Sequence, residues 1–148
     1  IDTSLVSPAQ LRSRIAQLFL NSAEDSLAVH CISFGFKYGV PMESDLVFDV
    51  RCLPNPFYDE KLRPLTGLDA PVRDYVMEKE ETKGFVARFT RMVGYLLPLY
   101  AKEGKSQLVI AVGCTGGTTP VALAQYMHDH LVQKGVRASV THRDMQKH

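Results

Sequence analysis

The sequence predicts a single α/β domain with a mainly parallel sheet of about four strands and helices on both faces. Three observations support this prediction. Short runs rich in β-branched and aromatic residues alternate along the chain with segments of helical periodicity. One run, residues 107–112, is almost wholly apolar, as expected for a strand buried on both faces. The length of 148 residues suits one domain with its own hydrophobic core.

The first half of the chain contains one predicted helix, two predicted strands and a long loop. Ser7 and Pro8 mark a helix start, and apolar residues then recur at helical spacing as far as position 19. Residues 26–36 are rich in β-branched and aromatic side chains, which indicates a strand, and residues 46–53 alternate as a second strand should. Residues 54–68 carry three prolines, and loops of this length in compact domains usually have a function.

The second half predicts three helices and two strands. Residues 69–77 form a short helix, and the longer helix after it contains Pro98, which either kinks or ends it. The buried strand at 107–112 leads through a glycine-rich loop into another helix, which Gly135 closes. Residues 136–141 form the last predicted strand.

Composition excludes several classes of protein. The hydrophobic share is 45% and the charged share 22%, so disorder is not expected. A formal net charge of +1 means that nucleic-acid binding would need a local basic patch. The three cysteines show no C-x-x-C spacing, which favours reduced thiols in a cytoplasmic protein. We expect no membrane segment, and both ends of the chain look cut, as in a fragment.

The strongest local signal is the loop at residues 113–120, which follows the buried strand and precedes a helix. In open α/β sheets ligands bind beyond the carboxyl ends of the strands, and glycine backbone together with a helix N-terminus favours an anion. A tight turn capped by Thr119 is the alternative. The residues that we expect to contact the anion are Cys114, Thr115, Gly116, Gly117 and Thr118.

Catalysis by this loop is not expected. The chain has no Walker A motif, and a thiolate phosphatase loop needs an arginine six residues after its cysteine. Cys114 stands at the nucleophile position, but position 120 is a proline, so a packed and inert thiol is the better interpretation. We therefore predict no catalytic residue in this part of the protein, and an enzyme that acts through Cys114 stays as the least favoured alternative.

A second polar cluster follows the strand at 46–53. Asp49 and Arg51 should share one face because side chains alternate along a strand, and Asn55 and Arg63 follow in the loop. The arginines could pair with phosphate and Asp49 could accept from a sugar hydroxyl or amine. A structural Asp–Arg ion pair beside a solvated loop is an equal alternative.

A third cluster, residues 141–144, follows the last strand and includes Arg143. It would lie near the same sheet edge if that strand is parallel, and a solvated terminus is the alternative. The five histidines form no metal-binding motif, so we predict no metal and no cofactor.

Six motifs stand out along the chain: SFGFKYGVP (33–41), DLVFDVR (45–51), LPNP (53–56), LRPLTGLD (62–69), GCTGG (113–117) and HRD (142–144). In these motifs and their order, the sequence closely resembles the C-terminal domain of the RapZ/YvcJ family over essentially the whole chain. Full-length members resemble a fusion of an N-terminal P-loop domain, which binds and hydrolyses ATP or GTP, to a domain of this kind. Residues 1–148 would then be the ligand- and RNA-binding domain alone, without that P-loop domain.

The resemblance implies an RNase adapter that senses an amino-sugar phosphate, glucosamine-6-phosphate, and binds small regulatory RNA as a homo-oligomer. It places Tyr38, Thr115 and Gly116 in the ligand pocket. A metabolite-binding regulatory module without an RNA role is the alternative. The family typically continues its two glycines with a His-Arg-Ser stretch whose arginine contacts the anion, and here residues 118–120 read Thr-Thr-Pro. A different ligand, a weaker affinity or an altered sequence would each explain this departure.

Overall fold

The computed structural model describes residues 27–56, 59–116 and 118–145, and within them it shows an α/β domain built on four strands. The strands are β1 (Ala28–Gly35), β2 (Leu46–Asp49), β3 (Gln107–Cys114) and β4 (Arg137–His142). All pairings are parallel and the order is β2-β3-β1-β4. The predicted single α/β domain with a parallel sheet is confirmed. The helix predicted from Ser7 lies outside the described residues.

Three α-helices connect these strands. α2 (Ala70–Glu78) and α3 (Glu80–Lys102) lie between β2 and β3, and α4 (Thr118–Gln133) joins β3 to β4. Pro98 does not end α3, which continues for another turn to Lys102. A short 3-10 helix, η2 (Phe36–Tyr38), follows β1 directly.

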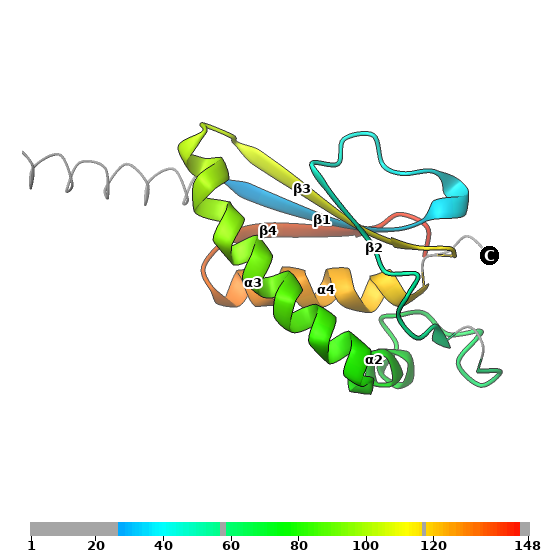
Figure 1. The fold of residues 1–148 in the computed structure, drawn as a ribbon. Coiled ribbons are helices and arrows are strands. Elements are labelled where there is room, and N and C mark those ends of the chain that lie inside the picture. Colours follow the sequence, from blue (N-terminus) through cyan, green and yellow to red (C-terminus); the bar gives the residue numbers. More distant parts are fainter. Residues whose placement is uncertain (1–26, 57–58, 117, 146–148) are drawn as a thin grey trace, which may run out of the picture.

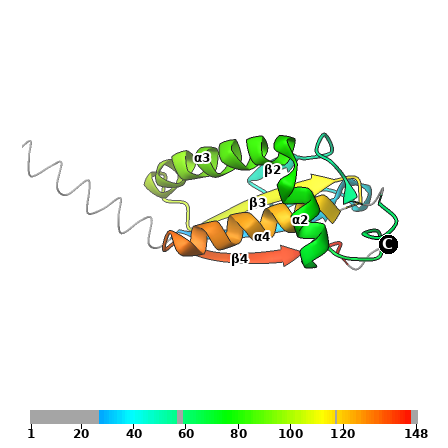
Figure 2. The same ribbon diagram turned by 90° about the horizontal axis from the view of Figure 1, so that it is seen from below.

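The core lies between the sheet and two of the helices. α3 and α4 pack side by side on one face, α4 over β1 and β4 (Figures 1 and 2). This face contains Val29 and Cys31 of β1 and Ile110 of β3, and apolar residues of both helices meet them. The helices that we expected on both faces are thus found on one in the described part of the chain. Helical periodicity shows which side of a helix is buried, but not which face of the sheet it covers.

The segment between β1 and β2, which contains η2, lies over part of the opposite face of the sheet (Figure 1), while Val47 of β2 and alternate residues of β4 are exposed on that face. Ile32, Phe34 and Ala111 are buried on that face. The backbone N–H of Val109 donates to the carboxylate of Asp45 at 2.8 Å, which ties the end of this segment to β3. On the central strands, irregular chain therefore takes the place that a helix has in a doubly wound fold.

β2 is shorter than predicted, because the chain turns away from β3 after Asp49. Asp49 is the last residue of β2 in register, opposite Gly113, and the Val50 N–H makes one further bond to the Gly113 carbonyl at 2.8 Å. The chain then turns, with the Leu53 N–H on the Val50 carbonyl at 3.0 Å. The alternation over residues 50–53 thus belongs to a turn, and the prediction of a strand there was wrong.

β3 is longer than predicted and takes in Gly113 and Cys114. A Cβ on Gly113 would lie 2.4 Å from Cζ of Phe34, so this glycine makes room for an aromatic ring of the neighbouring strand. The described loop is reduced to Thr115 and Gly116, and α4 begins at Thr118 rather than after a cap at Thr119. The glycine at 113 thus serves packing within the sheet.

Candidate functional site

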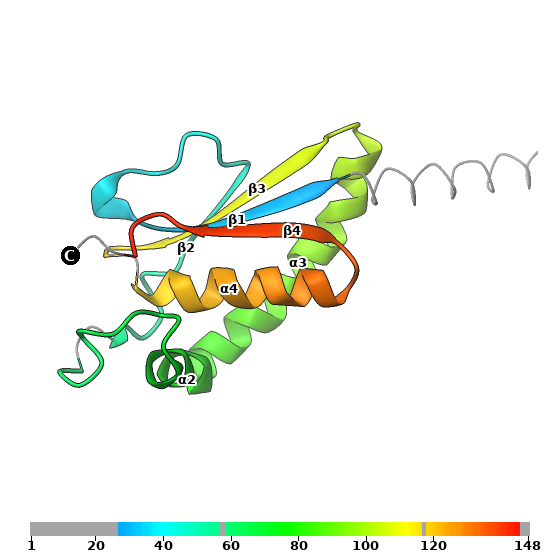
Figure 3. The same ribbon diagram turned by 180° about the vertical axis from the view of Figure 1, so that it is seen from behind.

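The carboxyl ends of the four strands meet at one edge of the sheet, because all of them run parallel (Figure 3). Asp49 ends β2, Cys114 ends β3 and His142 ends β4 at this edge. It is the edge at which open α/β sheets bind ligands. Arg143 follows β4 directly and so lies at this edge, as the prediction for a parallel last strand required.

A pocket of about 440 Å³ lies at this edge, beside the ends of β2 and β3. Its size is in the range of ordinary small-molecule sites. It is lined by Val50, Arg51, Cys52, Leu53, Pro54, Asn55, Tyr75, Glu81, Cys114, Thr115 and Thr119. The turn after β2, the start of α3 and the start of α4 therefore all contribute to it.

Arg51 is held at this pocket by a bidentate ion pair with Asp49. The Arg51 Nε lies 2.9 and 3.0 Å from the two carboxylate oxygens, and Nη2 lies 2.6 Å from Oδ2. The backbone N–H of Arg51 donates to the same carboxylate at 2.9 Å. These hydrogen bonds lower the pKa of Asp49 and raise that of Arg51, so both groups stay charged at neutral pH. The two side chains meet through the turn, not through strand alternation.

The turn from β3 into α4 is packed against β1 and against the long loop. A Cβ on Gly35 would lie 2.8 Å from the carbonyl carbon of Gly116, so β1 and this turn approach backbone to backbone. The Lys37 N–H donates to the Thr115 carbonyl at 3.3 Å. The Thr119 hydroxyl donates to the Pro54 carbonyl at 3.3 Å and thereby ties α4 to the loop. The backbone around the pocket is therefore fixed from two sides.

Two of the three cysteines line the pocket. Cys114 is buried, whereas Cys52 is exposed. The third, Cys31, lies in the core, where burial raises its thiol pKa to about 12. A buried sulfur at position 114 agrees with the interpretation of a packed thiol.

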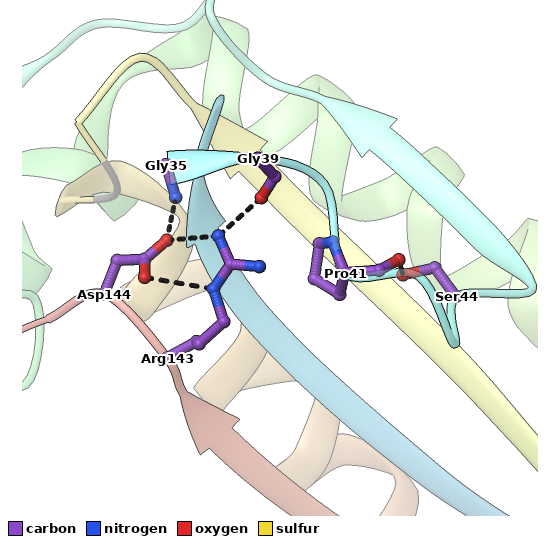
Figure 4. A network of polar contacts seen from close by, with 6 residues as sticks. All are labelled: Gly35, Gly39, Pro41, Ser44, Arg143 and Asp144. Atoms are coloured by element: carbon purple, nitrogen blue, oxygen red, sulfur yellow. Dashed lines mark hydrogen bonds and ion pairs between the residues drawn. The ribbon is translucent and has the colours of Figure 1, made fainter. Parts of the chain in front are cut away.

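Arg143 lies at the same edge but its guanidinium is engaged by the protein itself (Figure 4). It pairs with Asp144 through Nε at 3.0 Å and Nη2 at 2.7 Å, and Nη2 also donates to the Gly39 carbonyl at 2.5 Å. The Asp144 side chain is fully buried and also accepts the Gly35 N–H at 2.8 Å. We call these residues, Gly35, Gly39, Arg143 and Asp144, the β4 latch, because they fasten the end of β4 to the segment after β1.

The pocket gathers some of the predicted site residues and leaves others outside. Arg51, Asn55, Cys114 and Thr115 line it. The predicted residues that do not line it are Tyr38, Asp49, Arg63, Gly116, Thr118 and Arg143. Gly117 falls outside the described residues.

Sequence reasoning missed two polar residues of the pocket, Tyr75 of α2 and Glu81 of α3. Each looks in the sequence like an ordinary residue near the beginning or end of a helix, and Glu81 lies in a run of mixed charges that predicts a solvated surface. Only the packing of these helices beside the turn after β2 brings them to the site. No signal in the sequence would have found either one.

In 27–56, 59–116 and 118–145 no group of three or more His, Cys, Asp or Glu side chains is placed to hold a metal ion. None of the helices described there is both long and apolar enough to cross a membrane.

Comparison with known proteins identifies the family. A sequence model described as the RapZ C-terminal domain matches residues 27–146. The chain belongs to this family. The RapZ C-terminal domain therefore accounts for every described strand and helix, and the resemblance predicted from the sequence motifs is confirmed.

The relatives are about twice as long as this RapZ C-terminal domain, which aligns with one half of each of them. A nucleotide-binding protein of Bacillus cytotoxicus is 49% identical over 148 residues, which cover 99% of this chain and 50% of the relative. Nucleotide-binding proteins of Bacillus velezensis and Bacillus licheniformis are each 50% identical over 147 residues, with the same coverage. The chain thus spans about half the length of the curated relatives that it matches.

Proposed function

We propose that this domain senses a small anion and that its ligand is a phosphorylated amino sugar such as glucosamine-6-phosphate. The observation that carries the proposal is that one pocket at the carboxyl edge contains both a guanidinium, from Arg51, and a carboxylate, from Glu81. A ligand with an anionic group and an ammonium group would satisfy both. A simple sugar phosphate would satisfy only the first.

The remaining polar groups of the pocket suit a sugar. The Tyr75 and Thr115 hydroxyls can each donate or accept a hydrogen bond, and Asn55 adds an amide. The Thr119 hydroxyl already donates to the Pro54 carbonyl, so it can only accept from a ligand. Arg51 would bind the phosphate, because a planar guanidinium matches the geometry of phosphate oxygens. Glu81 would accept from the amine. The family's usual arginine after the glycines is absent, so Arg51 is the one cationic side chain that the described pocket offers to the phosphate.

Two substitutions separate these roles. Arg51→Lys should weaken the binding of glucosamine-6-phosphate and of glucose-6-phosphate alike, by about tenfold, because lysine cannot replace the planar fork. Glu81→Gln should weaken glucosamine-6-phosphate by about threefold and leave glucose-6-phosphate unchanged, because only the first ligand carries an amine. Isothermal titration calorimetry with both sugars measures each affinity. Failure of the wild-type protein to bind either sugar, with no thermal shift, would refute the proposal.

The second half of the proposal is a contact with small regulatory RNA, through which the domain would serve as an adapter for an RNase. The observation that favours it is the outer side of α3. After its first turn this helix carries three basic residues, Arg88, Arg91 and Lys102, and no acidic one, and Tyr95 is 69% exposed on it. Basic side chains that neutralise phosphates, beside an aromatic ring on which a base can stack, suit a nucleic acid.

Charge reversal on α3 tests this half. The affinity for a structured small RNA should fall steeply between about 50 and about 200 mM salt, and Arg91→Glu should reduce it about fivefold or more at low salt. Lys134→Glu makes the same charge change at the far end of α4 and serves as the matched control. A gel-shift assay provides the measurement. Equal effects of the two variants would contradict a site on α3.

A metabolite-binding regulatory module without an RNA role is the alternative, and the names of the relatives favour it. They are called nucleotide-binding proteins, and half of their length lies outside the match to this domain. In that case the pocket would report sugar-phosphate levels to a nucleotide-binding part of a full-length oligomeric protein. Sugar-phosphate binding together with no RNA binding at low salt would select this function.

A further inference from the structure

Phe36, the first residue of η2, does not line the pocket, yet its ring lies against the guanidinium that does. The Arg51 Cζ is 4.3 Å from the centroid of the Phe36 ring. A guanidinium at this distance from an aromatic face is attracted by the ring quadrupole, whose face is partially negative. Phe36 thus contacts Arg51 at its face, while Asp49 contacts it at one edge.

These two contacts together fix an exposed side chain. The Asp49 pairing uses Nε and Nη2 and sets the direction in which the guanidinium points. The Phe36 ring restricts the plane in which the guanidinium lies. The Nη1 edge takes no part in the pairing with Asp49, so this edge remains for a ligand. An arginine held in this way loses less conformational freedom when it binds an anion.

Phe36 is itself held by the core. Its ring packs edge to face on Phe34, with centroids 4.8 Å apart and planes at 68°. Phe34 is fully buried and its ring occupies the space left by Gly113. Packing against Phe34 of β1 therefore fixes the Phe36 ring, and the ring in turn orients the Arg51 guanidinium.

We infer that Phe36 is a positioning residue, which holds the Arg51 guanidinium at the pocket for the anionic group of the ligand. The inference rests on the proposed function, because the pocket must bind an anion for this orientation to have a consequence. The inference goes beyond the proposed function, because it assigns a role to a residue that does not line the pocket.

The orientation of Arg51 can be measured without a ligand. Ring-current shielding from Phe36 should move the Arg51 Hε resonance upfield in a ¹H–¹⁵N spectrum, assigned through its loss in Arg51→Lys. Phe36→Leu should remove this upfield shift and Phe36→Tyr should retain it. Phe85→Leu is the matched control, because Phe85 packs with Phe48 and Phe89 in the core. An Arg51 resonance that does not move in Phe36→Leu would overturn the inference.

The consequence for binding is measured with inorganic phosphate and with glucosamine-6-phosphate. Phe36→Leu should weaken both about two- to fivefold, and Phe36→Tyr should restore the affinity. In an Arg51→Ala background Phe36→Leu should have no further effect, because Phe36 acts through Arg51. Equal losses in both backgrounds would show a general structural role and overturn the inference. If the wild type binds neither compound, the proposed function fails, and the ligand-free spectrum still decides whether Phe36 orients Arg51.

Discussion

Two arginines at the carboxyl edge of the sheet look alike in the sequence and have different surroundings. Arg51 and Arg143 each follow a strand and each pair with a neighbouring aspartate. The Asp49 side chain is 46% exposed, whereas that of Asp144 is fully buried. A buried carboxylate needs all of its partners, so Arg143 is committed to the β4 latch. Arg51 stays at the surface, within reach of a ligand.

This difference predicts unequal effects of matched substitutions. Asp144→Ala should lower the free energy of unfolding by about 2–3 kcal/mol, because it leaves the Gly35 N–H without its acceptor and Arg143 without its carboxylate. Asp49→Ala removes an exposed pair and should leave the denaturation midpoint nearly unchanged. Urea denaturation followed by circular dichroism compares the two. Similar midpoints for both variants would contradict a structural role of the β4 latch.

At the scale of elements, the loop at 54–68 is held against the first turn of α4 by a close backbone approach. A Cβ on Gly67 would lie 2.6 Å from Cβ of Val121 and 2.8 Å from the carbonyl oxygen of Thr118. At its other end the loop contacts the same turn of α4, because the Pro54 carbonyl accepts the Thr119 hydroxyl at the pocket. One glycine therefore links the loop to the pocket wall.

Gly67→Ala should accordingly lower the free energy of unfolding by about 1–3 kcal/mol, since the added methyl group forces the loop away from α4. Gly94→Ala in α3 is the control, because a Cβ there meets no atom within 4 Å. Alanine inside a helix should stabilise the protein by about 0.5–1 kcal/mol. Thermal denaturation of both variants measures the two effects. The same sign of change in both would contradict the packing described.

At the scale of the whole molecule, His142 connects three elements in one polar chain across the helix-covered face. Its Nδ1 lies 2.8 Å from the Ser33 hydroxyl of β1, and its Nε2 lies 3.1 Å from Oε1 of Gln125 on α4. Because Oε1 only accepts, Nε2 carries the proton and Nδ1 accepts from Ser33. Burial first, and His128 on α4 second, lower the pKa of His142 below its ordinary value of 6.5.

The sign of the pH effect follows from this lowered pKa. Above about pH 6.5 His142 is neutral in both the folded and the unfolded chain, and its stabilising contacts are complete. As the pH falls, the unfolded chain binds the proton more readily than the folded one, so stability is lost. The difference in unfolding free energy between wild type and His142→Gln should therefore shrink from about pH 7.5 to about pH 5.5. A difference that stays constant over this range would contradict the prediction.

Local pattern was enough to predict most elements but not how they meet. The apolar run at 107–112 and the alternation at 46–49 depend on neighbouring residues, and both strands were predicted. The turn after Asp49 depends on where β2 separates from β3, which no local pattern contains. The same limit applies to the site, because Arg51 was predicted from a strand end, whereas Glu81 reaches the pocket only through the packing of α3.

The strand order also affects when the domain can assemble. β1 is the earliest of the described strands and lies between β3 and β4, whose residues come much later in the chain. Ser33 and His142, for instance, are 109 residues apart in the sequence. During synthesis β1 therefore has no partner strand on either edge until most of the domain has left the ribosome. A newly made chain should accordingly depend on chaperones more than a helical bundle of this size, although the finished fold is compact.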